Sequence, residues 1–261
     1  MEEREKNSSI PRILKTAMGV LILLAAWQMA ASSGIWSAYV LPPPMKVARA
    51  LGKMAESGIL FRHILVSGRR VLTGFSFAFV LAMAGGILAS QVRSAEEYYD
   101  GFLEFMRNVP PISLIALLIL WFGIGETSKI IIIVLASFFP MYLNIRKGFL
   151  SASKMLLEVG CVFRLTRWQK FYRIVLPWAV PDILVGMRIG LGYSWRAIIG
   201  AEMIAASSGL GYLILDAQQM SRSDKVIAGI LTIGVVGILC DKLFSLVISR
   251  VTGARGVGGA K

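Results

Sequence analysis

About six apolar runs, each close to the length that a helix needs to cross a bilayer, limit what this chain can fold into. They cover approximately residues 16–36, 71–90, 106–126, 129–144, 183–206 and 226–248. Hydrophobic residues make up 56% of the 261-residue chain, which is too apolar for an ordinary soluble domain. The sequence therefore predicts an all-α, polytopic membrane protein with about six transmembrane helices.

The beginning of the chain imitates a secretory signal peptide, because a charged segment is followed by an apolar run and small residues. An uncleaved first span is favoured over cleavage, since more spans follow and the leading segment carries charges of both signs. We expect a cytoplasmic tail at 1–15, a first span at 16–36, the main transmembrane domain at 37–250 and a cytoplasmic tail at 251–261.

The net charge of +13 would suggest a nucleic-acid partner in a soluble protein. Here the basic residues lie largely between apolar runs, so they indicate topology and contacts with membrane lipid rather than with nucleic acid. With both termini inside, about eighteen Lys and Arg residues fall on cytoplasmic segments and about nine outside, which fits the positive-inside rule. The external segment 33–70 is the exception, because it carries about six of those nine.

The longest polar interruption in the second half of the chain runs over residues 157–177. Its charged and apolar residues form separate stripes at helical spacing. Thr166 and Gln169 have the spacing of a capping box, which predicts a helix start at this point. We expect two short helices with a corner at Arg164–Leu165, closed by Pro177. Such a pair could be a plug, an element lying on lipid or a docking site.

This stretch resembles the cytoplasmic coupling loop of ATP-binding-cassette importer permeases. In that family the loop begins Glu-Ala-Ala, has a Gly six residues after the Glu and ends Leu-Pro. Here the Glu is Glu158 and the ending is Leu176-Pro177, but Val-Gly follows the Glu and Arg164 occupies the Gly position. A Gly suits a left-handed helix terminus, where an Arg costs roughly 1–2 kcal/mol. Either this corner is built differently or the strain is tolerated.

The resemblance extends from about residue 41 to residue 250, and it is to the nitrate, sulfonate and taurine branch of these permeases. The motifs occur in the order of that family. They are Leu41-Pro-Pro-Pro44, His63 with Ser67 and Arg70, Arg107 with Val109-Pro-Pro111, Leu120-Trp-Phe-Gly-Ile-Gly-Glu126 with Lys129, Pro140, Leu176-Pro177 with Pro181, Gly186-Met-Arg188, Ala201-Glu-Met203 and Gly209-Leu-Gly211.

The resemblance implies a permease subunit of the bacterial inner membrane that imports a small anion, of the nitrate, sulfonate or taurine type. It implies a second permease chain, commonly in a homodimer, an extracytoplasmic solute-binding protein and separate ATPase subunits that bind the ATP. The coupling loop, at 148–181 between spans four and five, would sit in a groove of the ATPase. The expected contact residues are Glu158, Arg164, Leu165, Thr166 and Trp168. The alternative is that the apolar stripe packs on the chain's own spans.

The fifth apolar run contains Arg188, Arg196 and Glu202, and charges inside a span tend to face the bundle interior. Arg196 could contact an anionic substrate, although an Arg–Glu pair that fixes packing is favoured. Glu202 lies near the external end, where a hydrogen bond at a helix end or gate is favoured. Small residues up to Gly209 and Gly211 could form a narrow gate, or they could simply serve ordinary helix packing.

The sequence does not predict an enzyme. It lacks the phosphate-binding pattern Gly-x-x-x-x-Gly-Lys-Ser/Thr, so we expect no ATP or other cofactor on this chain. Its one histidine, His63, and its two cysteines, Cys161 and Cys240, do not have metal-ligand spacing, and an interfacial role is favoured for His63. An intramembrane enzyme would need paired acids or a His/Cys constellation inside the spans. The remaining alternative is an autonomous secondary transporter or channel.

Overall fold

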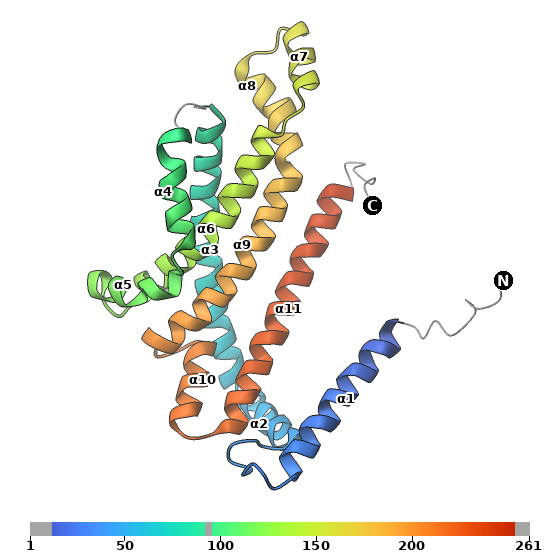
Figure 1. Ribbon diagram of the computed structural model, residues 1–261, viewed down its shortest axis with the longest axis vertical. Helices are drawn as coiled ribbons and strands as arrows, with labels where there is room; N and C mark the ends of the chain where they lie inside the picture. Colours follow the sequence, from blue (N-terminus) through green and yellow to red (C-terminus); the bar gives the residue numbers. More distant parts are fainter. Residues whose placement is uncertain (1–11, 92–95, 254–261) are drawn as a thin grey trace, which may run out of the picture. The chain divides into compact units, whose positions relative to one another are not determined.

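The computed structural model of the protein describes residues 12–91 and 96–253, and all secondary structure within these ranges is helical (Figure 1). The all-α class is therefore confirmed. Most of the predicted tail 1–15 and most of the tail 251–261 lie outside the described residues. The chain divides into two compact units, which are treated separately below. One contains the chain up to Leu60 together with Ile214–Leu231, and the other contains Phe61–Leu213 together with the chain from Thr232 onward.

The smaller unit contains α1 (Arg12–Ser32), α2 (Pro44–Glu56), the second half of α10 (Leu210–Gln219) and the first part of α11 (Ser223–Gly253). Proline occupies the start of α2, where a missing amide hydrogen costs least. The helix is amphipathic as predicted, because its buried residues share one face and its basic residues are exposed. The turn before α2 is held to α1 by the Trp27 indole N–H, which donates to the Pro42 carbonyl at 3.1 Å.

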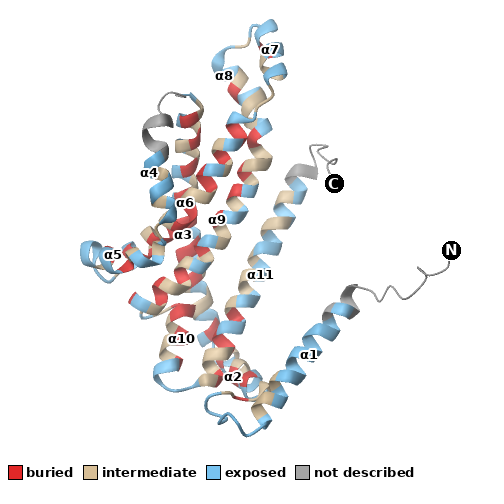
Figure 2. Ribbon diagram, in the orientation of Figure 1, coloured by how far each residue is buried: buried red, intermediate tan, exposed pale blue. Residues whose placement is uncertain are grey.

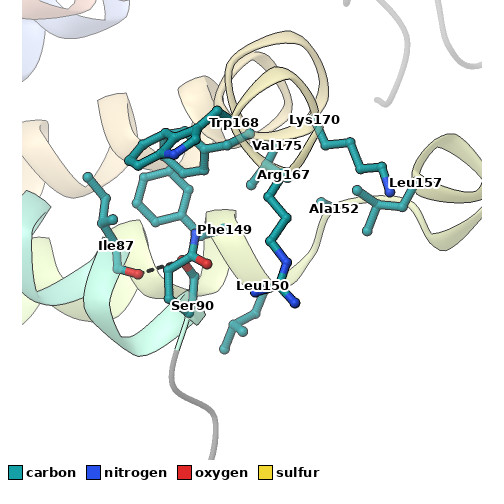
Figure 3. Close-up of a pocket in the computed structure, with 12 residues that line it drawn as sticks. Ile87, Ser90, Phe149, Leu150, Ala152, Leu157, Arg167, Trp168, Lys170 and Val175 are labelled. Carbon is teal, nitrogen blue, oxygen red and sulfur yellow. Dashed lines mark hydrogen bonds between the residues drawn. The ribbon is translucent and has the colours of Figure 1, made fainter. Parts of the chain in front are cut away.

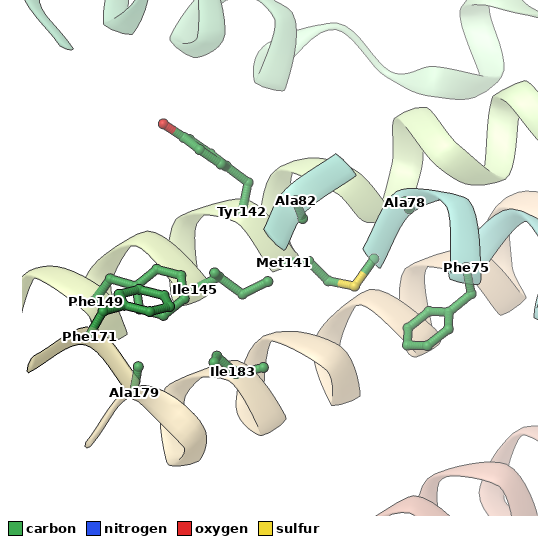
Figure 4. Close-up of a cluster of buried hydrophobic side chains, with 10 residues drawn as sticks. All are labelled: Phe75, Ala78, Ala82, Met141, Tyr142, Ile145, Phe149, Phe171, Ala179 and Ile183. Atoms are coloured by element: carbon green, nitrogen blue, oxygen red, sulfur yellow. The ribbon is translucent and has the colours of Figure 1, made fainter. Parts of the chain in front are cut away.

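The core of the larger unit lies where α3 (Ile59–Gln91), α6 (Glu126–Leu150) and α9 (Leu176–Ala205) meet (Figures 2 and 4). Small residues let these helices approach closely. A Cβ atom added at Gly190 of α9 would lie 2.5 Å from Cγ of Met141, and one added at Gly86 of α3 would lie 2.6 Å from Cγ2 of Ile145. The buried residues of this cluster are Phe75, Ala78, Ala82, Met141, Tyr142, Ile145, Phe149, Phe171, Ala179 and Ile183.

The segment before the third predicted span differs from the expectation. The acidic residues Glu96, Glu97 and Asp100 predict a polar loop over 91–104, which would be followed by one span over 106–126. The structure instead has α4 (Glu96–Asn108), a 3-10 turn (Pro111–Leu114) and α5 (Ile115–Phe122), with a bend of 84° between the two arms. The paired prolines explain the bend, because Pro110 is extended and proline disfavours helical geometry in the residue before it. The expected third span over 106–126 is therefore not one continuous helix, and the pair is a broken span or a re-entrant loop.

The helix before Pro177 does not end there, so the prediction that proline closes it was wrong. Helix α8 (Arg167–Lys170) continues through a π-helical turn (Phe171–Val175) into α9, and the whole helical stretch Arg167–Ala205 spans 39 residues. Pro177 lies in the first turn of α9. Its ring would normally clash with the carbonyl four residues back, and that carbonyl, of Arg173, lies inside the wider π turn. The helix that contains the predicted fifth span therefore begins well before residue 183.

Four helical segments in the described ranges are long and apolar enough to cross a membrane, or five if the bent pair forms one span. The four are Ile59–Gln91, Glu126–Leu150, Arg167–Ala205 and Ser223–Arg250. The predicted total of about six is reached only by adding the bent pair and the shorter apolar helix Ala17–Ser32. Many large apolar side chains on these helices are exposed, as expected for surfaces that meet lipid or another protein chain.

Candidate functional site

The corner between α7 (Lys154–Val162) and α8 is built on a left-handed residue, Arg164, whose φ angle is +52°. The Leu165 N–H donates to the Gly160 carbonyl at 2.9 Å, and the Arg164 N–H donates to the Cys161 carbonyl at 2.9 Å. These two bonds form a Schellman motif, which normally has glycine in the left-handed position. Of the two possibilities raised by the sequence, the structure shows the second: the corner has the glycine-type geometry, and Arg164 adopts it.

The capping box at the start of α8 is confirmed. Thr166 Oγ1 accepts a hydrogen bond from the Gln169 N–H at 3.3 Å, and Gln169 Oε1 accepts one from the Thr166 N–H at 2.9 Å. Behind the corner, α7 lies close to the α8–α9 helix at Gly160, where an added Cβ would be 2.9 Å from Cδ1 of Ile174. Motif, cap and close packing fix the angle between the two helices, so the corner can move as a rigid body.

The apolar stripe of this loop splits into two parts, one buried against the chain's own spans and the other exposed. Phe171 is buried and packs against Phe149, with ring centroids 5.6 Å apart. The remaining large side chains at the corner have no such cover: Val162 is 81% exposed, Phe163 73% and Trp168 70%. One part therefore anchors the loop to the chain's own spans, and the other forms a free apolar surface.

The structure places the five predicted coupling residues within this one corner. Glu158, Arg164, Thr166 and Trp168 are exposed, and Leu165 is partly buried. Glu158 forms no salt bridge with any described residue. The corner thus presents apolar side chains together with an acidic one, a composition suited to docking on another protein.

A second cluster, which is buried and charged, lies at the other end of α9. Glu202 is fully buried, and its carboxylate accepts hydrogen bonds from Arg70 Nη1 at 2.8 Å, from Ser67 Oγ at 2.8 Å and from the Gly211 N–H at 3.0 Å. Arg70 also donates to the Ser208 carbonyl at 2.6 Å. A buried ion pair is stable only when its remaining polar atoms also form hydrogen bonds, and the contacts of Ser67, Ser208 and Gly211 provide these bonds.

Glycine is required where the turn after α9 closes over Glu202. Gly209 has a φ angle of +113°, and an added Cβ would fall on the Glu202 carboxyl group. An added Cβ at Gly211 would meet the Ile199 carbonyl and lie 2.8 Å from Cβ of Glu202. The turn is also held from α3, because the Gly209 N–H donates to His63 Nδ1 at 2.9 Å. Three of the four predicted gate residues are therefore brought together.

Arg70 connects this cluster to the start of α6. Its Nε donates to Glu126 Oε2 at 2.7 Å and its Nη2 to Glu126 Oε1 at 2.6 Å, and Lys129 Nζ lies 3.2 Å from the same carboxylate. This contact explains part of the charge anomaly in segment 33–70. Arg62, Arg69 and Arg70 belong to helix α3, and Arg70 is neutralised by two carboxylates.

The fourth predicted pathway residue, Arg196, lies apart from the buried cluster. It is exposed, and its guanidinium carbon lies 5.7 Å from the centre of the Tyr193 ring. Arg188 pairs with Asp241 of α11 through two 2.7 Å hydrogen bonds, and both side chains are about half exposed. The sequence suggested an Arg–Glu pair for the charged residues of this span. In the structure Glu202 pairs with Arg70 of α3 and not with an arginine of α9.

The sequence reasoning did not assign the network around Ser67, Arg70 and Glu126, although these residues appeared in the family motifs. The available signal was spacing: His63, Ser67 and Arg70 lie four and three residues apart, which places them on one face of a helix. In the part of the chain that the structure describes, no group of three or more His, Cys, Asp or Glu residues could hold a metal ion.

Residues 81–253 match the family described as "Binding-protein-dependent transport system inner membrane component". A putative aliphatic sulfonates transport permease protein, SsuC of Bacillus subtilis, is 39% identical over 86% of this chain and 82% of that protein. The taurine transport system permease protein TauC of Escherichia coli is 32% identical over 89% and 86%. The nitrate import permease protein NrtB of Synechocystis is 30% identical over 94% and 91%.

A solved structure of the MetNI methionine ABC transporter in an inward-facing conformation shares the fold, with a TM-score of 0.65. The similarity covers 77% of this chain and 97% of that chain, at 16% sequence identity.

Proposed function

This chain belongs to the family of binding-protein-dependent transport system inner membrane components, and we propose that it forms the pathway of an importer for a small anion. Members of this family are transport permeases rather than enzymes. An importer permease of the ATP-binding-cassette class works with a separate ATPase and with a binding protein that delivers the solute. In this proposal ATP is bound by that ATPase, and the chain itself holds no cofactor.

The exposed apolar corner between α7 and α8 carries the proposal. It is rigid, because a Schellman motif and a capping box fix its geometry, and it is anchored to the core through Phe171. A docked ATPase could therefore move the corner, and the 39-residue helix that continues from it would transmit the movement into the span. Glu158, Arg164, Leu165, Thr166 and Trp168 are the proposed contacts.

The proposed cargo is an anion of the sulfonate, taurine or nitrate type. The names of three relatives support this class, since aliphatic sulfonates, taurine and nitrate all carry a compact oxyanion group. Arg196 supports it as well, because it is an exposed cation within a span and has no carboxylate partner among the described residues. An uncompensated charge inside a span favours a position beside a water-filled path or a second chain.

The turn over Glu202 is the proposed gate. Its glycines bring the backbone into contact with the Glu202 side chain, and Arg70 links the turn to both α3 and α6. Movement of α9 would therefore directly displace Gly209 and Gly211. A closed gate of this kind has two discrete arrangements, one with the hydrogen bonds made and one with them broken.

For the arrangement in the membrane we propose a homodimer in the bacterial inner membrane, with both termini in the cytoplasm. The proposed division keeps a tail at 1–15, a first span at 16–36, a permease domain at 37–250 with the coupling loop at 148–181, and a tail at 251–261. The cluster of basic residues around the coupling loop supports a cytoplasmic location for it.

Uptake by proteoliposomes tests the function. The permease is reconstituted with its ATPase, and radiolabelled taurine, an alkanesulfonate or nitrate is supplied with the binding protein. We expect uptake only when ATP is enclosed on the ATPase side and the binding protein is present outside. Uptake by the permease alone, without ATP, would contradict the proposal and would support an autonomous carrier or channel.

A further inference from the structure

A cavity of about 730 Å³ opens between the coupling corner and the ends of α3 and α6 (Figure 3). Part of its wall is apolar, where Ile87, Leu150 and Val175 contribute aliphatic surface and Phe149 and Trp168 contribute aromatic rings. Such a volume lies within the range of small-molecule sites in proteins. The cavity lies at helix ends rather than at mid-span, so an occupant would sit at the level of the membrane surface.

The charge of this cavity has one sign. Arg167 and Lys170 line it, and no described carboxylate does. Neither cation is neutralised elsewhere in the described chain: Arg167 forms no ion pair, and Lys170 donates to the Cys161 thiol at 3.0 Å. In Figure 3 the side chains of Arg167 and Lys170 extend on the side of the cavity away from Ile87. An occupant must therefore combine negative charge with an apolar part.

We infer that this cavity binds the head group of an anionic phospholipid. The phosphodiester would meet Arg167 and Lys170, and the upper acyl chains would lie against the apolar wall at Ile87 and Leu150. Basic pockets between membrane helices on the cytoplasmic side are suited to such head groups. The inference rests on the proposed function for one point, the assignment of this end of the helices to the cytoplasmic leaflet.

A lipid in this position would act on the coupling corner itself. Arg167, Trp168 and Lys170 belong to α8, and Ile87 and Leu150 belong to α3 and α6. An occupant would therefore tie the corner to the two core helices across the cavity. Transport by the intact complex would then respond to the anionic lipid content of the membrane.

Native mass spectrometry of the full-length permease in mild detergent tests the site. The probes are phosphatidylglycerol, phosphatidylcholine with the same acyl chains, and glycerol 3-phosphate. The test variant is the double substitution Arg167→Gln with Lys170→Gln. The matched control is Lys154→Gln with Arg173→Gln, which removes the same charge from exposed positions of the same loop that do not line the cavity.

We expect wild type and the control to retain phosphatidylglycerol in preference to phosphatidylcholine. The cavity variant should bind phosphatidylglycerol roughly thirtyfold more weakly, since each cation near anionic lipid contributes about fivefold. Equal retention by the cavity variant and the control would overturn the inference. Binding of glycerol 3-phosphate with the same affinity as phosphatidylglycerol would overturn it too, because the acyl chains would then contribute nothing to binding. A wild-type permease that shows this lipid preference but does not co-purify with an ATPase would count against the proposed function alone.

Discussion

The Leu165 amide donates to the Gly160 carbonyl at 2.9 Å, and this bond closes across Arg164, a non-glycine residue in the left-handed conformation. The bond is possible only if the chain reverses direction at Arg164, and that reversal sets the angle between α7 and α8. A residue other than glycine makes the reversal at some cost in stability.

Replacing Arg164 therefore separates the cost of the left-handed backbone from the loss of the side chain. Both Arg164→Gly and Arg164→Ala remove the guanidinium, but only glycine is free of the left-handed strain. We expect the free energy of unfolding to be about 1 kcal/mol higher for the glycine variant than for the alanine variant. The glycine variant should therefore have the higher thermal unfolding midpoint in detergent. Equal stability of the two variants would show that the corner does not hold this conformation.

Gly209→Ala should disrupt the turn over Glu202. The added methyl group would fall on the Glu202 carboxyl group at a φ angle of +113°, so strain and overpacking combine to about 2–4 kcal/mol. Gly192→Ala is the control, because a Cβ at Gly192 of α9 meets nothing within 4 Å. The control should unfold at or slightly above the wild-type temperature, since alanine favours a helix over glycine. A Gly209→Ala variant as stable as this control would be evidence against the turn geometry.

Arg70→Leu should be among the most destabilising substitutions in the chain. It leaves the fully buried Glu202 carboxylate without its cation, which costs about 3–5 kcal/mol. Glu126→Gln should lower the stability much less, since the Glu126 side chain is 58% exposed and the ion pair between Arg70 and Glu202 remains. Thermal unfolding of the two variants and of the double variant measures the difference. A smaller loss for Arg70→Leu than for Glu126→Gln is not compatible with this network.

Cys161 provides a test of orientation that needs no introduced cysteine. It is exposed at the coupling corner, and Cys240, in α11, is only partly so. We expect a membrane-impermeant maleimide to label Cys161 rapidly in inside-out vesicles and not in right-side-out vesicles or intact spheroplasts. A Cys161→Ser variant identifies the labelled site. Rapid labelling from the outside would place the corner in the extracytoplasmic space and would refute the coupling role.

Local features of the coupling corner were predictable from the sequence because they depend on neighbouring residues. The Thr166–Gln169 capping box and the corner at Arg164–Leu165 both follow from short-range patterns, and the structure has each of them. The assignment of these residues to docking stays a prediction.

Features that depend on distant residues were not predictable in this way. Arg70 and Glu202 are separated by 132 positions, so hydrophobic periodicity on either helix gives no sign that they pair. Helix α4 was mistaken for a loop because the acidic residues Glu96, Glu97 and Asp100 dominate its first turns, although apolar residues follow them. The π turn before α9 was missed since proline usually marks a helix end, and only the path of the whole helix shows that it continues.

The most direct test of the central claim is affinity co-purification of an ATPase subunit with the tagged permease in mild detergent. The comparison is between wild type, Glu158→Ala, Trp168→Ala and the control Trp36→Ala, which removes an exposed tryptophan outside the corner. We predict that wild type and the control retain the ATPase in equal amount and that both corner variants lose most of it, since a central interface tryptophan contributes about 2 kcal/mol or more. Retention of the ATPase by both corner variants, or a wild-type permease that purifies alone from its native host, would contradict the account.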